Sequence, residues 1–417
     1  MAQLSDDCFA FGGPMLRVDE AIALIRTRIQ PVAEVETVPL SASDQRVLAE
    51  TVLAGRPVPP FDNSAVDGYA VRHADLAASG ESRLPVSARL PAGSGNMDAI
   101  RPGTAVRIFT GAPMPEGADT VFMQEDVRVE GGSVILPAGL KAGANRRFAG
   151  EDFACGAEVL VEGTRLDPRR VAALAAIGLP AVSVRRRVRV ALFSTGAEIV
   201  EPGSPLGPAQ QFDANRTMLA ALLRRRGVEV LDLGILPDER ETIAASLRAA
   251  AQRVDLILTS GGVSTGEEDH VKAAVESVGR LTFWRIAIKP GRPVALGTIA
   301  GAAFVGLPGN PVASFVTFVN VAAPLIDRLA GAAPSPVTGF PVAAEFSYRK
   351  KAGRREYVRA ALAIAAQGGL VARKYPREGA ALIGSLIATD GLVELQEDVT
   401  DIVPGATVTF LPYGSLY

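Results

Sequence analysis

Apolar positions between residues 188 and 332 form short continuous runs that alternate with stripes at helical spacing. Four of the runs are typical of buried strands: VRVALF, VEVLDL, DLILTS and LTFWRIAI. The stretches between and after them predict helices over residues 215–226, 239–253, 270–278 and 311–330. Strands that alternate with helices indicate a doubly wound, mostly parallel α/β sheet. Ligands of such sheets bind beyond the carboxyl ends of the strands, so functional residues are expected there.

The rest of the chain differs from this central segment. Apolar residues at helical spacing predict a helix over 18–30, and Asp167 with Pro168 suits the start of another. Residues 56–153 are rich in proline and glycine and carry only short apolar runs, which favours strands joined by turns. Three runs after residue 335 predict a small β module: REYVRAALAI, GLVEL and ATVTFL.

These patterns predict an α/β protein of several domains, in agreement with a length of 417 residues at about 100–200 residues a domain. The central doubly wound domain spans residues 188–332. A β-rich insertion domain, residues 56–153, interrupts a mixed helical N-terminal domain made of residues 1–55 and 154–187. Residues 335–417 are expected to form a small, β-barrel-like C-terminal domain.

Composition excludes several classes of protein. Lys and Arg number 43 against 45 Asp and Glu, a balance that argues against a nucleic-acid-binding groove. Hydrophobic residues are 48% and charged residues 21% of the chain, which suffices for packed cores. Two cysteines, Cys8 and Cys155, cannot build a disulfide scaffold or a four-thiolate zinc site, which indicates a reducing compartment. No signal peptide or membrane-spanning run is recognisable, so we expect a cytoplasmic protein that binds neither nucleic acid nor membrane.

The loop after DLILTS carries the strongest indication of ligand binding. Ser260, Gly261 and Gly262 end the strand, and glycines let a ligand approach backbone N–H groups closely. Ser264 or Thr265 can cap the next helix, whose N-terminus would attract an anion such as a phosphate. A well-capped loop without a ligand would have the same spacing.

The segment 262–266 also matches G-x-S-x-G, the nucleophile elbow of serine hydrolases. Such a hydrolase needs a histidine base, and the chain has only His73 and His270. His270 lies on the helix directly after the serine and cannot readily turn back toward it. A hydrolase is therefore disfavoured.

Two further loops of the α/β segment suit an anion. GLPGNP, residues 306–311, follows a strand and favours the start of a helix. In AIKPGRP, Lys289 and Arg292 flank a Pro-Gly turn near a strand end. Basic side chains there would bind an anionic ligand, although a solvated rim is the alternative.

Five carboxylates lie in glycine-containing loops or at helix starts: Asp67, Asp152, Glu198, Asp238 and Asp269. Each alone suits a capping role, as Asp238 does before the helix over 239–253. If they cluster around an anion-binding loop, a divalent cation is needed to offset the repulsion between the carboxylates and the anion. The scarcity of histidine and cysteine leaves oxygen ligands, which favours Mg²⁺ over Zn²⁺.

The chain resembles the MoeA family of molybdopterin molybdenumtransferases, to which the C-terminal domain of gephyrin is related. Six stretches carry the resemblance in family order: PPFDNSAVDGYAVR, RIFTGAPMPEGADTV, VRVALFSTGAEI, LTSGGVSTGEEDHVK, FWRIAIKPGRP and GLPGNPVAS. The resemblance implies a homodimer of elongated four-domain subunits. It also implies Mg²⁺-dependent insertion of molybdate into adenylylated molybdopterin, which releases AMP and gives molybdenum cofactor. A molybdopterin adenylyltransferase would act upstream, and molybdoenzymes or their chaperones would receive the product.

The resemblance also assigns roles to particular residues. It implies catalytic roles for Asp67, Thr110, Asp152, Glu198, Asp238 and Asp269, of which Glu198, Asp238 and Asp269 would hold the metal. Substrate would contact Ser260, Gly261, Gly262, Ser264, Gly266, Glu267, Pro308, Gly309, Asn310 and Pro311. Molybdate would bind Lys289, Pro290, Arg359 and Ser385. Ala197 departs from the family pattern, in which an acid is frequent at that position.

Two other functions compete with this one. A molybdopterin adenylyltransferase shares the α/β module, but that family lacks segments such as 1–187 and 335–417. A non-catalytic scaffold of the gephyrin kind is disfavoured because the acidic set and Lys289 are retained. In the expected dimer, Asp67 and Thr110 of the long insertion would complete the site of the other subunit.

Overall fold

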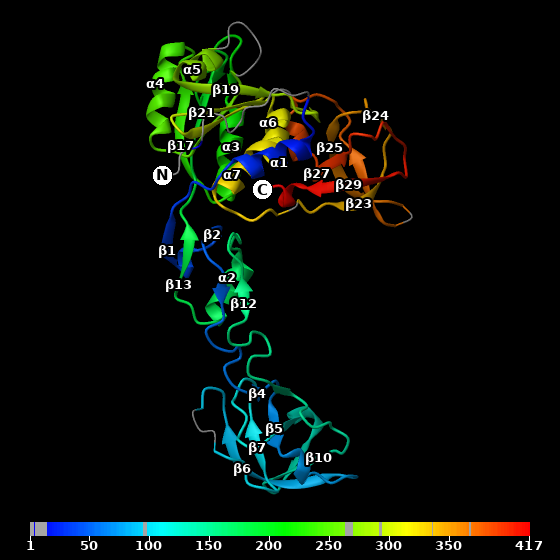
Figure 1. Cartoon of the computed structure of the whole chain (residues 1–417). Coiled ribbons are helices and arrows are strands. Elements are labelled where there is room, and N and C mark those ends of the chain that lie inside the picture. The colour runs from blue at the N-terminus through cyan, green and yellow to red at the C-terminus, as the bar shows by residue number, and fades with distance from the viewer. Residues whose placement is uncertain are drawn as a thin grey trace.

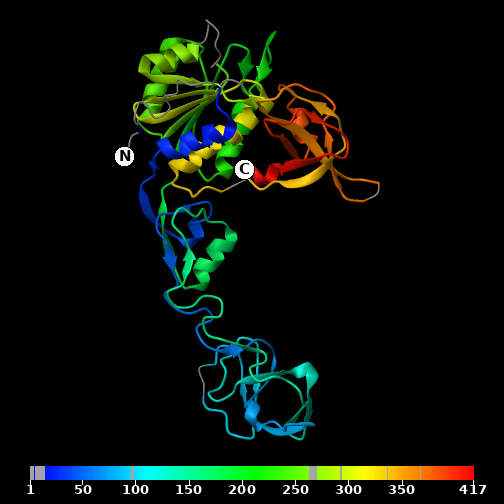
Figure 2. The same cartoon turned by 45° about the vertical axis from the view of Figure 1, so that its right-hand side comes forward.

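The structure, a computed structural model, describes residues 4, 15–94, 98–262, 270–291, 294–335, 337–366 and 368–417. The chain forms an elongated molecule in which a narrow neck separates two bodies (Figure 1). One body holds an α/β unit with a β-barrel beside it, and the other is a curled β unit at the far end of the neck. The turned view in Figure 2 shows the same separation.

The α/β unit is built on a six-stranded sheet in the order β17-β14-β18-β22-β21-β19. Its strands are β14 (Arg189–Thr195), β17 (Glu229–Leu236), β18 (Leu256–Ser260), β19 (Gly279–Trp284), β21 (Val294–Ile299) and β22 (Ala302–Leu307). β21 runs against the other five, so the sheet is mostly parallel as predicted. The sequence did not indicate the hairpin of β21 and β22, because both strands are fully buried and show no polar alternation.

Helices cover both faces of this sheet. One face carries α1 (Val18–Arg28), α3 (Ala214–Arg225), α6 (Pro311–Thr317), the π-helical turn η4 (Phe318–Ala322) and α7 (Ala323–Leu329). The other face carries α4 (Arg240–Ala251) and α5 (His270–Val278). The helix predicted over 270–278 is confirmed to the residue, whereas η4 interrupts the one predicted over 311–330.

The continuous helical segment Pro311–Leu329 is long and apolar enough to cross a membrane by length and composition. In the structure, 83% of the apolar 18-residue stretch within this segment is buried. It packs between the sheet and its neighbouring helices, with α1 against α7. Burial in the α/β core therefore accounts for its apolar character.

The neck contains a three-stranded antiparallel sheet, two antiparallel strand pairs and the helix α2. Its elements are β1 (Val35–Pro39), β2 (Val47–Leu48), β13 (Ala181–Arg185), β3 (Val52–Leu53), β12 (Glu158–Leu160), α2 (Pro168–Ala176), β4 (Asn63–Ser64) and β11 (Arg146–Arg147). Asp167 accepts a hydrogen bond from the Arg170 N–H at 2.9 Å, and Pro168 opens α2 as predicted. The chain passes outward through the neck and returns antiparallel to itself.

The distant unit is a curled six-stranded sheet in the order β8-β5-β7-β6-β10-β9. Its strands are β5 (Gly68–Val71), β6 (Ser82–Leu90), β7 (Ala105–Ile108), β8 (Thr120–Met123), β9 (Arg128–Glu130) and β10 (Ser133–Leu136). Viewed along its axis in Figure 2, the sheet curls into a nearly closed ring. Two apolar clusters pack against its strands, so this part of the chain has a core of its own.

The barrel closes because β25 pairs with both β26 and β27. Its strands are β23 (Phe340–Ala344), β25 (Arg355–Ile364), β26 (Leu370–Lys374), β27 (Gly391–Leu395) and β29 (Thr407–Pro412). Its smaller elements are β24 (Tyr348–Arg349), α8 (Gly384–Ile387) and β28 (Asp401–Ile402). A strand that leaves the α/β unit, β20 (Ile288–Lys289), pairs in parallel with β25 and places Lys289 opposite Glu356. The two units therefore share a seam, and the predicted multidomain α/β fold with a barrel-like C-terminal part is confirmed.

Candidate functional site

Two loops of the predicted substrate site are held together at the carboxyl edge of the sheet. β18 and β22 are parallel neighbours that end at Ser260 and Leu307, so the loops after them start side by side. Asn215 Nδ2, from α3, donates to Ser260 Oγ at 2.9 Å and to the Gly309 carbonyl at 2.6 Å. Ser260 Oγ donates in turn to the Pro308 carbonyl at 3.0 Å. The structure thus brings the two predicted loops into one site.

The two glycine positions 262 and 309 at this edge differ in what the fold demands. A Cβ on Gly309 would lie 3.6 Å from the Cα of Gly261, which is an ordinary contact. Gly262 has a φ of +66°, and a Cβ there would lie 2.6 Å from Val271 Cγ2. The fold alone therefore requires glycine at 262, and the bare backbone it leaves is suited to an anion. The helix start expected in GLPGNP is confirmed, with Asn310 as the N-cap residue of α6, although its side chain makes no cap hydrogen bond.

Glu198 and Asp238 follow the neighbouring strands β14 and β17 at the same edge, and both are exposed. Asp238 Oδ1 accepts a hydrogen bond from Thr195 Oγ1 at 3.1 Å. Its predicted capping role is wrong, because Glu239 occupies the residue before α4. A Cβ on Gly196 would lie 2.5 Å from Glu198 Oε2, so the Glu198 carboxylate folds back over the end of β14.

These two carboxylates fit a magnesium ion only as part of its ligand set. Mg²⁺ prefers oxygen ligands and is commonly held by one or two carboxylates together with substrate phosphates. In the part of the chain that the structure describes, no group of three or more His, Cys, Asp or Glu side chains could hold a metal ion. Asp238 and Glu198 therefore suit a cation that arrives with, or is completed by, a phosphate-bearing ligand.

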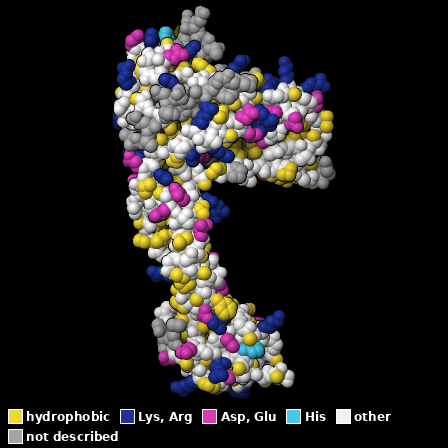
Figure 3. All heavy atoms as spheres, in the orientation of Figure 1, with side chains coloured by type: hydrophobic (Ala, Val, Ile, Leu, Met, Phe, Trp, Pro, Cys, Tyr) yellow, Lys and Arg dark blue, Asp and Glu magenta, His cyan; other side chains and the backbone are white. Residues whose placement is uncertain are grey.

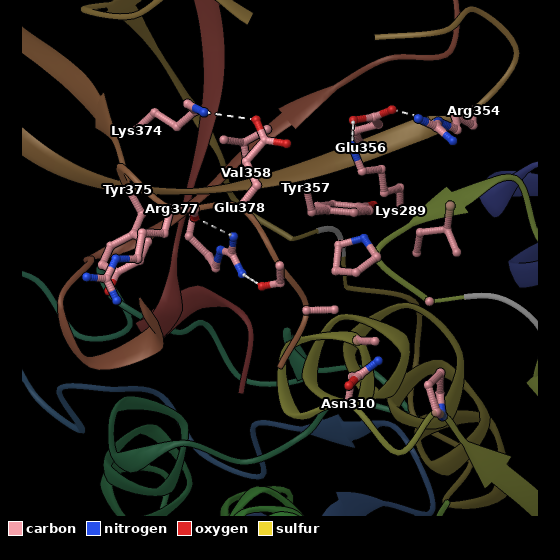
Figure 4. Close-up of a pocket in the computed structure, with 18 of the residues that line it drawn as sticks. Lys289, Asn310, Arg354, Glu356, Tyr357, Val358, Lys374, Tyr375, Arg377 and Glu378 are labelled. Atoms are coloured by element: carbon pink, nitrogen blue, oxygen red, sulfur yellow. Dashed lines mark hydrogen bonds and ion pairs between the residues drawn. The ribbon is translucent and has the colours of Figure 1, made fainter. Parts of the chain in front are cut away.

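A cavity of about 390 Å³ lies at the seam between the α/β unit and the barrel (Figure 4). The α/β side contributes the turn 288–291, which includes the predicted Lys289 and Pro290, as well as Pro308 and Asn310. Among the described residues that line it, five are basic and two are acidic: Lys289, Arg354, Arg359, Lys374, Arg377, Glu356 and Glu378. A cavity with this excess of cations suits a small oxyanion or a phosphate group.

Lys289 is held by partners from the barrel. Its Nζ donates to Tyr348 Oη at 3.0 Å and lies 3.2 Å from Glu356 Oε2. Tyr348 Oη donates to the same carboxylate at 2.7 Å, and Arg354 Nε donates to Glu356 Oε1 at 2.6 Å. Figure 4 shows Lys289, Glu356 and Arg354 grouped along one wall. These contacts fix the position of the Lys289 ammonium in the wall of the cavity.

Both members of the Lys289–Glu356 pair are charged near neutral pH. Burial opposes the charge on Lys289, but Tyr348 and Glu356 outweigh burial and raise its pKa. Burial likewise opposes the charge on Glu356, yet hydrogen bonds from Tyr348, Arg354 and Lys289 lower its pKa on balance. The carboxylate is 1% exposed and the lysine side chain 43% exposed, so the lysine is the member that a ligand can reach.

Arg359, on β25, lines the same cavity as Lys289. Its guanidinium donates to the carbonyls of Gly379 at 2.6 Å and Arg377 at 3.3 Å, and burial lowers its pKa. A guanidinium has five donors and stays charged, so it can bind an anion while it donates to these two carbonyls. Ser385, in contrast, is buried in α8 and donates to the Leu382 carbonyl outside the residues that line the cavity. The structure groups three of the four predicted molybdate residues and separates Ser385 from them.

Asp67 and Thr110 meet in the distant unit. The Thr110 N–H and its Oγ1 both donate to Asp67 Oδ1 at 2.8 Å, and these bonds lower the pKa of Asp67. Asp152 is exposed in the neck itself, between β11 and β12, where its N–H donates to the Val58 carbonyl. Within one chain, the neck separates Asp67 and Thr110 from the carboxyl edge of the α/β sheet (Figure 1).

Comparison with known proteins follows the same division of the chain. Three family models match: the MoeA N-terminal region (domain I and II) over residues 16–178, a probable molybdopterin binding domain over 191–328 and the MoeA C-terminal region (domain IV) over 341–413. A molybdopterin molybdenumtransferase of Haemophilus influenzae is 38% identical over 404 residues, which is 96% of this chain and 100% of the relative. The chain belongs to the MoeA family of molybdopterin molybdenumtransferases.

Other relatives of the MoeA family agree in sequence and in structure. Molybdopterin molybdenumtransferase 2 of Mycobacterium tuberculosis is 37% identical over 382 residues, 88% of this chain and 93% of the relative. The crystal structure of a molybdopterin biosynthesis MoeA protein from Pyrococcus horikoshii OT3 matches with a TM-score of 0.80 at 29% identity, over 96% of this chain and all of the other. The family assignment made from the six sequence stretches is confirmed, and with it the transferase class.

The sequence did not indicate the residues that the barrel supplies to the cavity, among them Tyr348, Arg354, Glu356 and Lys374. The strand REYVRAALAI was predicted correctly, but no local pattern indicates that Glu356 meets Lys289. Several predicted residues lie outside the described part of the chain: Ser264, Thr265, Gly266, Glu267, Asp269 and Arg292. Their roles stay predictions.

Proposed function

We propose that this protein inserts molybdate into adenylylated molybdopterin in a Mg²⁺-dependent reaction that releases AMP and gives molybdenum cofactor. The observation that carries the proposal is the cationic seam cavity, where Lys289 of the α/β unit and Arg359 of the barrel line one space. Pro308 and Asn310 belong both to this cavity and to the glycine loop at the sheet edge. The proposed oxyanion site and the sheet edge that would accept phosphate therefore share these two residues.

The roles divide by chemistry. Lys289 and Arg359 would hold the molybdate oxygens by charge-assisted hydrogen bonds. The loops after β18 and β22 would receive the nucleotide-pterin with their bare backbone. Asp238 and Glu198 would hold Mg²⁺, which supplies charge stabilisation at the phosphate linkage. The pterin dithiolate is the ligand that takes the metal, so the chain needs to supply no nucleophile.

We further propose that the active form is a homodimer. Asp67 and Thr110 form a hydrogen-bonded pair at the end of the neck, too far along the molecule to reach their own carboxyl edge (Figure 1). The distant unit of a second subunit can supply them. In that case, mixing Asp67→Asn with Asp238→Asn protein, at a Mg²⁺ concentration too low to support Asp238→Asn alone, should restore part of the activity through mixed dimers. A monomer in sedimentation that retains full activity would contradict this arrangement.

The upstream partner would be a molybdopterin adenylyltransferase, and molybdoenzymes or their chaperones would receive the cofactor in the cytoplasm. Neither nucleic acid nor a membrane is proposed as a partner. In support, Figure 3 shows basic and acidic side chains interspersed over the face in view, without a continuous basic stripe.

The decisive assay mixes the purified protein with adenylylated molybdopterin, Mg²⁺ and molybdate and measures AMP by chromatography. AMP release that requires both Mg²⁺ and molybdate is the expected result. If the protein instead adenylylates molybdopterin from ATP, the competing adenylyltransferase function is correct. If AMP release proceeds equally without molybdate, the coupling proposed here is wrong.

A further inference from the structure

Behind the oxyanion cavity, a cluster of charged side chains joins the barrel to the α/β unit. The Arg355 guanidinium donates to Asp19 of α1 at 3.0 and 2.7 Å and lies 3.4 Å from Glu394 and 3.3 Å from Glu397 of the barrel. Its backbone N–H donates to the Ala287 carbonyl at 2.8 Å, in the segment that leads to β20. Arg355 is 7% exposed, so one buried residue connects these three parts of the protein through its side chain and its backbone.

Tyr357, two residues further along β25, lines the cavity and connects it to the same cluster. Its Oη lies 2.7 Å from Asn320 Oδ1 and 3.0 Å from Glu394 Oε1, both of which accept hydrogen bonds. Burial raises the pKa of Tyr357 well above its ordinary value, so the hydroxyl keeps the proton that it donates. Asn320 Nδ2 donates to the Val316 carbonyl of α6 at 2.8 Å. The hydroxyl thus ties the barrel wall to the long core helix.

That helix also forms the opposite wall of the cavity. Pro308, Asn310 and Ala313, at and before the start of α6, line the cavity from the α/β side. Asn320 lies in η4, the π-helical turn in the middle of the helix, and such turns recur at functional sites. The two walls belong to different units, so the distance between them depends on how the barrel sits on the helix.

We propose that Tyr357 and Arg355 are positioning residues that fix the barrel on the α/β unit and thereby set the width of the cavity between β25, which carries Arg359, and the start of α6. The inference rests on the proposed function, in which this cavity binds molybdate. Hydrogen bonds weaken steeply outside a narrow range of distances and angles, so a small displacement of the barrel relative to α6 lowers affinity for an oxyanion held between the two walls. Neither positioning residue has to touch the oxyanion.

The test compares Tyr357→Phe with Tyr413→Phe in calorimetric titrations of the full chain with molybdate. Tyr413 is a matched control, since its hydroxyl bonds Thr389 Oγ1 at 2.8 Å and its ring packs on Phe315 of α6, outside the residues that line the cavity. Loss of one buried hydrogen bond in Tyr357→Phe should raise the Kd about three- to tenfold. Tyr413→Phe should leave the Kd within about twofold even where it lowers the melting temperature as much.

Asp19→Asn weakens the same cluster by removing the charge of the α1 residue that binds Arg355. The Asp19 side chain is 63% exposed, so this variant folds, and Arg355 keeps its two barrel carboxylates. The Kd for molybdate should rise about two- to threefold, as expected for a partly exposed ion pair.

Lys289→Ala separates failure of this inference from failure of the proposed function. If it leaves molybdate binding unchanged, the cavity is not the oxyanion site. If Lys289→Ala weakens binding but Tyr357→Phe does not, or if Tyr413→Phe weakens it equally, the positioning role is wrong.

Discussion

Replacement of Lys289 by alanine should weaken molybdate binding about tenfold. An ammonium has three donors, and in the structure two of them are directed at Tyr348 Oη and Glu356 Oε2, at 3.0 and 3.2 Å. The third can serve an oxyanion. A charge-assisted hydrogen bond contributes about 1.5–3 kcal/mol, equivalent to roughly ten- to hundredfold in affinity. The side chain is 43% exposed, so water and the neighbouring carboxylate screen its charge and favour the lower end of this range.

The assay is calorimetric titration with molybdate, with the melting temperature measured on the same samples. Lys351→Ala is the matched control, because Lys351 is an exposed lysine of the barrel outside the residues that line the cavity. Excess molybdate should restore turnover of the Lys289 variant. An affinity within about twofold of the parent protein, or an equal loss in Lys351→Ala, would refute the reasoning, since a solvated lysine contributes little to binding.

Three further predictions concern other parts of the site. Glu356→Gln should lower the melting temperature at neutral pH and flatten its fall at acid pH. A carboxylate with a lowered pKa stabilises the fold above its ordinary pKa, and this stabilisation is lost as pH falls through the lowered value. An unchanged dependence of the melting temperature on acid pH would contradict the prediction. Asp238→Asn should raise the Mg²⁺ concentration needed for half-maximal AMP release, and excess Mg²⁺ but not excess molybdate should rescue it. Asn215→Ala should weaken adenylylated molybdopterin about tenfold in a fluorescence titration and leave molybdate unaffected, because both loops lose the amide that joins them; equal effects on the two ligands would exclude this division.

The carboxyl edge of the α/β sheet was the part of the site most accessible from the sequence. The loops that carry Glu198, Asp238, Ser260 and Pro308 each follow a recognisable strand, and parallel strands bring their ends to one edge. The predicted cap at Asp238 failed because α4 begins one residue later, with Glu239 as its N-cap residue, and the Asp238 carboxylate accepts from the Thr195 hydroxyl of the neighbouring strand instead. Which hydrogen-bond partner a carboxylate takes depends on tertiary contacts, and a local sequence pattern does not predict these.

The seam cavity could be predicted only in part. Lys289 and Pro290 stand in a recognisable turn, but the partners of Lys289 come from β25 through the pairing of β20 with that strand. A hydrophobic pattern indicates which face of a strand is buried, but it does not identify the distant segment with which the strand pairs. For the same reason the sequence could not place Asp67 beside Thr110, which the pairing of β5 with β7 brings together.

The most direct test of the central claim is diffraction at the molybdenum absorption edge from crystals soaked in molybdate. The account predicts the strongest anomalous peak in the seam cavity, with oxygens within hydrogen-bond reach of Lys289 Nζ and the Arg359 guanidinium. The peak should disappear in crystals of Lys289→Ala soaked at the same concentration. A strong peak elsewhere on the molecule, with the cavity free of molybdenum, would contradict the assignment of this seam as the oxyanion site.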